Sequence, residues 1–207
     1  MHHDAVSGWL MLASFYYKMK QYNTARYILS YALSKCTPEK ACYQTNWSEY
    51  QYELIKTNTI QSLGITNILK LLRVSCVAFT PHSTLIPEEL ELWVVNDVHI
   101  LPPVAYPHFL LCMCHIRLNN VSQCYNSIRK GQLTIRENYF ISDYMERSNS
   151  YNCLGVAYQL IGKRVLAEYA FGQAIKLDPA SNCALQRLEM VIKNQHKRWL
   201  NWFIIII

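Results

Sequence analysis

The sequence has little charge, little glycine and little proline. Charged residues make up 16% of its 207 residues, against roughly 25% in a typical domain. Glycine (6) and proline (7) together reach about half of their usual share of roughly 12%. These shortages argue against intrinsic disorder, a collagen-like chain and a turn-rich β-barrel, and they favour long, tightly packed helices. So low a content of charged residues also suggests that part of the protein surface is covered by something else.

The net charge of +6 is spread along the chain. Its densest patch is Lys193, His196, Lys197 and Arg198. Nucleic-acid binding normally leaves a basic stripe or face, and this patch is a weak one. We interpret it as a solvated helix face and do not expect a nucleic-acid partner.

The eight cysteines form no C-x-x-C pair and no spacing typical of a disulfide framework. The N-terminal MHHDAVSGW lacks the apolar region of a signal peptide and the pattern of a transit peptide. Reduced, mostly buried thiols in the cytosol or nucleus are the simplest account. We therefore predict a cytoplasmic protein.

An internal repeat decides the fold class. Residues 148–181 hold Tyr151, Leu154, Gly155 and Tyr158, followed by Ala167, Phe171, Ala174 and Pro179. This segment resembles the tetratricopeptide (TPR) repeat family at every signature spacing, with Tyr in place of the first Trp. The resemblance implies a helix, a short turn and a second antiparallel helix in each unit. One such hairpin cannot bury its apolar face alone, so units are expected to stack.

Two further segments fit the same frame. From Val6 the eight slots hold Trp9, Leu12, Ala13, Tyr16, Ala25, Leu29, Ala32 and Thr37. From Ala105 a degenerate copy keeps the spacing and the small residues Cys112 and Cys124. We predict one all-α domain, a TPR-like helical-hairpin solenoid with an irregular insertion and a C-terminal capping helix. Its units are 6–39, 105–138 and 148–181, the insertion is 40–104, and the cap helix is 182–200.

The insertion and the tail fit no repeat unit. An apolar helical stretch is predicted from Ile60 to Val77, a single helical turn at Pro87–Leu90, and a small hairpin about Asn96-Asp97. The end of the chain, Trp199–Ile207, is too short to span a bilayer. A membrane-interface anchor is one interpretation of it. We prefer a truncated end, and expect a fragment of a longer protein without a membrane partner.

The residues His108, Cys112 and His115 share one face of a predicted helix, with Cys124 across the turn. Two His and two Cys suit tetrahedral zinc. These four residues also occupy the packing positions of the repeat. We therefore interpret them as packing residues and predict no metal site. The chain has no G-x-S-x-G, phosphate-binding glycine loop or H-E-x-x-H motif. We predict no enzymatic activity, no cofactor and no small-molecule substrate.

The TPR resemblance places function in a groove lined by the first helix of each unit. At the groove positions of the family, this chain has Leu10, Ser14, Tyr17, Tyr106, Phe109, Met113, Asn149, Asn152, Val156 and Gln159. Some family members bind chaperone C-terminal carboxylates through a Lys/Asn/Arg clamp, which this chain lacks. An apolar middle flanked by neutral amides suits a helix or an apolar peptide. In the alternative, residues 40–104 fold over this groove and fill it.

A second resemblance rests on the segment LIPEELELWVVNDVHILPPVAYPHFLLC, followed by QLTIRENYFI. It is similar to a C-terminal helical region of invertebrate proteins of the cyclic-GMP-AMP-synthase-like receptor family. This resemblance implies an accessory or regulatory region of a nucleotidyltransferase-like innate-immune sensor, and no nucleotidyltransferase motif lies in the chain. Our main prediction is a non-catalytic protein–protein interaction module, a TPR-like scaffold that binds a protein or peptide partner.

Overall fold

The computed structural model describes residues 6–42, 49–81, 83–93, 98–180 and 183–193. This part of the chain is mostly helical with little strand, which confirms the all-α expectation at that level. The long helices form three pairs: α1 (Val6–Lys18) with α2 (Tyr22–Ser34), α6 (Ala105–Arg117) with α7 (Val121–Arg136), and α8 (Tyr144–Leu160) with α9 (Arg164–Leu177). None of the helices in the described ranges has the length and apolar content needed to cross a membrane.

The same turn closes each pair. Its residue with positive φ is Lys20 in the first pair (60°), Asn119 in the second (56°) and Gly162 in the third (73°). Gly162 adopts this left-handed conformation without a Cβ penalty, and Asn tolerates it better than most residues. In each turn the next backbone N–H donates to the carbonyl five residues earlier, at 2.8 to 2.9 Å. The same turn conformation therefore connects the two helices in all three pairs.

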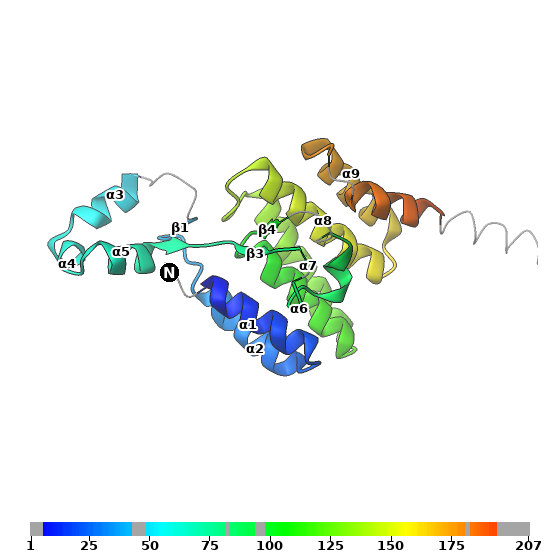
Figure 1. Ribbon diagram of the computed structural model, residues 1–207, viewed down its shortest axis with the longest axis horizontal. Coiled ribbons are helices and arrows are strands. Elements are labelled where there is room, and N and C mark those ends of the chain that lie inside the picture. Colours follow the sequence, from blue (N-terminus) through cyan, green and yellow to red (C-terminus); the bar gives the residue numbers. More distant parts are fainter. Residues whose placement is uncertain (1–5, 43–48, 82, 94–97, 181–182, 194–207) are drawn as a thin grey trace, which may run out of the picture.

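Small residues let the helices of a pair approach closely. Ala13 and Ala25 are fully buried between α1 and α2, and Ala167 is fully buried in α9. Gly155 faces Phe171, so that a Cβ at Gly155 would lie 2.5 Å from the ring. The pairs are also in contact with one another, since α2 packs on α6, and both α6 and α7 pack on α8. The three pairs thus follow one another in chain order, although a long segment separates the first two (Figure 1).

The first part of that segment forms an arm that projects from the long helices (Figure 1). The arm consists of α3 (Glu49–Lys56), α4 (Asn58–Gln61) and α5 (Ile65–Leu72). At its base, β1 (Ala41–Cys42) pairs in parallel with β2 (Arg73–Val74), in the register Ala41↔Arg73 and Cys42↔Val74. The predicted helical stretch was therefore too long, because α5 ends at Leu72 and the backbone of Val74 is held in the strand pair.

The second part of the segment returns to the stack. Strand β3 (Val77–Phe79) pairs antiparallel with β4 (His99–Leu101), and the 3-10 helix η1 (Glu88–Trp93) lies between them in the chain. This helix lies where the sequence predicted a helical turn. The predicted hairpin had its centre at Asn96-Asp97, and residues 94–97 lie outside the described residues. His99 and Ile100, which follow this centre in the chain, pair with Phe79 and Ala78 of β3.

Helix α8 begins at Tyr144, four residues before the predicted start of the third unit. The reason is the N-cap residue Asp143, whose carboxylate accepts the backbone N–H of Glu146 at 2.8 Å. After α9, residues 183–193 are helical. The remainder of the predicted cap helix, the basic residues 196–198 and the tail 199–207 lie outside the described residues.

Candidate functional site

The ten predicted groove residues lie on α1, α6 and α8. Eight of them are buried: Leu10, Ser14, Tyr17, Tyr106, Phe109, Met113, Asn152 and Val156. Asn149 and Gln159 are partly exposed. The helix face that these residues form is therefore covered, and we refer to it as the inner face.

Strands of the insertion cover part of the inner face. Phe79 of β3 is fully buried, and its ring meets the ring of Tyr106 edge to face, with 5.7 Å between centroids. Asn149 donates its side-chain N–H to the carbonyl of Ile100 in β4, at 2.9 Å. Strand β3 also contacts α1, and β4 contacts α8. The sequence left open whether the groove is free or filled by the insertion, and in this structure the insertion contacts three of the ten predicted residues, Tyr17, Tyr106 and Asn149.

Hydrogen bonds join the buried hydroxyls of the inner face. Ser14 donates to the carbonyl of Leu10 at 2.9 Å. Ser14 Oγ and the phenolic oxygen of Tyr106 are 2.6 Å apart. Because Ser14 has one proton and gives it to Leu10, the Tyr106 hydroxyl donates to Ser14. Burial raises the pKa of Tyr106 well above its usual range, so the phenol keeps the proton that this bond needs.

An acidic anchor fixes the middle of the covering segment. The Glu89 side chain is 9% exposed, and its Oε1 accepts from Tyr17 at 2.6 Å and from Arg117 at 2.9 Å. Arg187 donates to the backbone carbonyl of Glu89. We call Tyr17, Arg117 and Arg187, with Glu89 between them, the Glu89 clamp. It joins the insertion to α1, to α6 and to the helix at residues 183–193.

The clamp holds a charged acceptor between neutral and cationic donors. Burial, followed by the hydrogen bond to Glu89, raises the pKa of Tyr17 well above its usual range. Tyr17 is therefore a neutral donor, and Arg117 supplies the positive charge. At the rim, Lys18 pairs with Glu91 at 2.8 Å, and these two side chains are 26% and 53% exposed. Exposed pairs of this kind contribute little stability, so the hydrogen bond between the buried Tyr17 and Glu89 side chains contributes most.

The sequence identified Tyr17 as a groove residue but missed Glu89, Arg117 and Arg187. The sequence predicted only a helical turn at Pro87–Leu90, the segment in which Glu88 and Glu89 lie. A signal was present, because Glu88, Glu89 and Glu91 concentrate acid in a basic chain with 14 Asp and Glu. Such a cluster requires basic partners, and the sequence alone does not indicate which of the 20 Lys and Arg they are.

The residues weighed as zinc ligands do not form a metal-binding group in the part of the chain that the structure describes. Cys112 of α6 is paired with Cys124 of α7 in a disulfide, with their Cα atoms 4.3 Å apart. This pairing differs from the expectation of reduced thiols throughout, because the close helix contact that small side chains allow also brings two sulfurs together. Burial, with the nearby Lys130 charge, lowers the pKa of His108 to about 4.

A small cavity lies among α6, α7 and α8. Its volume is about 20 Å³, and its lining includes His108, Phe109, Ile128 and Leu154. A cavity of this size has room for about one water molecule. It offers no space for a substrate.

Comparison with protein-family models, curated proteins and solved structures gives no match. Both resemblances described above stay predictions, and the function proposed for the chain rests on its residues and their geometry.

Proposed function

We propose that this chain is a non-catalytic protein-interaction module, a TPR-like stack of helical hairpins that binds a short peptide segment on its inner face. The observation that carries the proposal is the Glu89 clamp. In it, side chains from three separate helices converge on the short acidic 3-10 helix η1 of the insertion. A surface that recognises such a segment within the chain has the chemistry to recognise a similar segment of a partner.

The covering segment indicates what kind of peptide the inner face takes. Phe79, Ile86 and Leu90 are buried to 3% exposure or less, and Glu89 supplies one acidic anchor. The ligand class is therefore a short segment with spaced apolar side chains and a carboxylate, presented in part on a 3-10 helical turn, rather than a purely apolar peptide. Main-chain contacts such as that of Ile100 with Asn149 add affinity without requiring a particular side chain.

A partner has to compete with the internal segment. A tethered segment has an effective concentration on the order of millimolar, which reduces the apparent affinity of any external peptide. The apparent Kd rises as the fraction of chains with an open inner face falls. Weakening the internal segment should therefore raise the affinity for an external peptide, provided that the inner face stays intact.

The test uses a fluorescent peptide with the sequence of residues 85–93 and measures its anisotropy on titration with the full chain. In the released chain, Glu89→Gln and Leu90→Ala weaken the internal segment. We expect the released chain to bind the peptide at least about tenfold more tightly than the wild type does. Adding Tyr17→Phe and Arg117→Met to the released chain removes the donors and should abolish the gain. Far-UV circular dichroism checks that all chains keep their helices.

Equal binding by the wild-type and released chains, with helices retained, would contradict the proposal. So would a gain in affinity that survives the loss of the Tyr17 and Arg117 donors, because binding would then occur elsewhere on the protein.

A further inference from the structure

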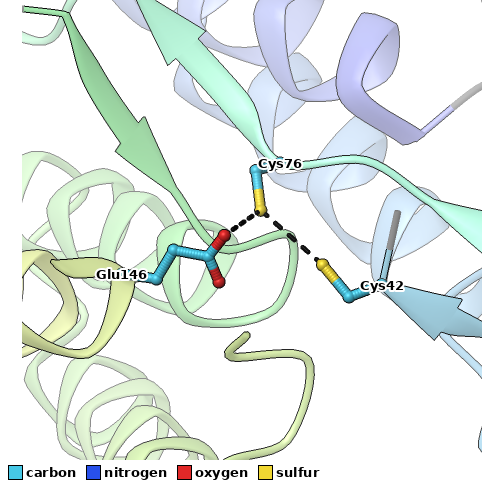
Figure 2. Close-up of side chains that lie close together, drawn as sticks. All are labelled: Cys42, Cys76 and Glu146. Carbon is cyan, nitrogen blue, oxygen red and sulfur yellow. Dashed lines mark hydrogen bonds between the residues drawn. The ribbon is translucent and has the colours of Figure 1, made fainter. Parts of the chain in front are cut away.

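Two thiols and a carboxylate from three distant segments meet at the base of the arm. Cys42 ends β1, Cys76 lies between β2 and β3, and Glu146 is in the first turn of α8. The sulfur of Cys76 is 3.9 Å from that of Cys42 and 3.2 Å from Oε1 of Glu146. All three potential ligand atoms lie within 4.8 Å of one another. Figure 2 shows the sulfur of Cys76 between the other two side chains.

The backbone directs these groups toward one point. The parallel pairing of Cys42 with Val74 places Cys42 beside the chain that leads to Cys76. The Asp143 cap fixes the first turn of α8, in which Glu146 lies. The second oxygen of Glu146, Oε2, accepts the backbone N–H of Ser142 at 2.7 Å. The carboxylate is thus held by one oxygen, and its other oxygen faces the thiols.

Burial makes this arrangement costly without a cation. Glu146 is 1% exposed and Cys42 is 3% exposed. Among the described residues, no Lys, Arg or His forms an ion pair with Glu146. A buried carboxylate without a counter-charge is strongly disfavoured, and buried charges in proteins are usually paired or coordinate metals.

Two of the three ligand-atom separations are close to those of a tetrahedral zinc site, and the third is within 4.8 Å. Zn–S bonds of about 2.3 Å and Zn–O bonds of about 2.0 Å, at tetrahedral angles, place two sulfurs about 3.8 Å apart and a sulfur and an oxygen about 3.5 Å apart. The corresponding separations here are 3.9 and 3.2 Å. Thiolates select zinc over magnesium and calcium, which prefer oxygen ligands.

We propose that Cys42, Cys76 and Glu146 bind one zinc ion, with water as the fourth ligand. On binding, the two thiols become thiolates and release their two protons to solvent. The ion ties β1 and the β2–β3 connection to α8, and so it fastens the base of the arm to the third helix pair. This proposal does not depend on the peptide-binding function, because none of its ligands contacts the Glu89 clamp in the described hydrogen bonds and ion pairs.

The test measures zinc in the full chain, purified under reducing conditions and dialysed against a weak chelator. We expect about one zinc per chain by elemental analysis. Cys42→Ser, Cys76→Ser and Glu146→Gln should each lower the zinc content at least about tenfold. Cys183→Ser is the matched control, since Cys183 is a buried cysteine outside the cluster, and it should keep the metal.

Cobalt(II) added to the metal-free wild-type chain gives a second measurement that needs no variant to fold. A thiolate-to-cobalt charge-transfer band with intense d–d absorption would support a tetrahedral thiolate site. A wild-type chain without zinc and without this spectrum would overturn the proposal. Zinc that persists in all three ligand variants would do the same. A Cys42–Cys76 disulfide mapped by mass spectrometry in the purified protein, with no metal bound, would replace the zinc site by a covalent link.

Discussion

Tyr17 and Glu89 are 72 positions apart in the sequence, and their side chains form a hydrogen bond of 2.6 Å between the phenolic oxygen and Oε1. The bond joins the first helix of the stack to the segment that covers it. Tyr17 is 4% exposed, so this bond is shielded from water. It is therefore a sensitive point at which to test how the inner face holds its cover.

Replacing Tyr17 with Phe removes the donor and leaves the ring in place. Glu89 then loses one of its two side-chain donors while it stays buried, and we expect the free energy of unfolding to fall by about 1–3 kcal/mol. Denaturant titration of the wild type and the variant measures this difference. Tyr27→Phe is the control, because Tyr27 is 77% exposed and should leave stability nearly unchanged. Similar losses in both variants would show that the Glu89 bond is not responsible.

Two glycines on neighbouring helices should respond in opposite directions to the same substitution. In Gly155→Ala the new Cβ would lie 2.5 Å from the buried ring of Phe171, and we expect a loss of about 1–3 kcal/mol in the free energy of unfolding. In Gly172→Ala the new Cβ has no atom within 4 Å, so the gain in helix propensity should stabilise the chain by about 0.5–1 kcal/mol. Thermal unfolding of the two variants makes the comparison. Two variants of equal stability would mean that α8 and α9 do not approach as described.

His108 should make the protein less stable in mild acid. Burial lowers the pKa of His108 to about 4 in the folded chain, while in the unfolded chain it is about 6.5. As the pH falls from about 6.5 to about 4, the unfolded state takes up a proton that the folded state does not. The free energy of unfolding then falls by up to about 1.4 kcal/mol for each pH unit.

The substitution His108→Phe isolates this effect, because an aromatic residue suits the slot and does not titrate. The stability difference between variant and wild type should widen in favour of the variant as the pH falls from about 7 to about 5. Carboxylates common to both chains cancel in the difference. A difference that is constant with pH would show that His108 is not the group responsible.

Local patterns in the sequence predicted the parts of the fold that local interactions determine. The turns at Lys20, Asn119 and Gly162 fall at one frame position, because helix length and turn geometry depend on neighbouring residues. The small residues Ala13, Ala25 and Ala167 occupy signature positions of the repeat, and all three are buried.

The interactions that cover the inner face depend on partners far apart in the chain. Glu89 meets Tyr17, Arg117 and Arg187 across 72, 28 and 98 positions, and no spacing rule connects them. Strands β1 and β2 have two residues each, too few to show the alternation that predicts a strand. Cys42, Cys76 and Glu146 escaped notice because each is alone in its own segment.

The strand pair at Ala41 and Arg73 brings the two ends of the arm to one point. The arm therefore leaves the long helices and returns to them at one point, and the packing of these helices does not depend on the length of the arm. Closure entropy depends only weakly on length: in a flexible loop, doubling the number of residues costs only about 0.6 kcal/mol. This is the place where the chain can gain, lose or exchange a whole module at the least cost, so a reporter domain could be inserted there while the three helix pairs keep their register.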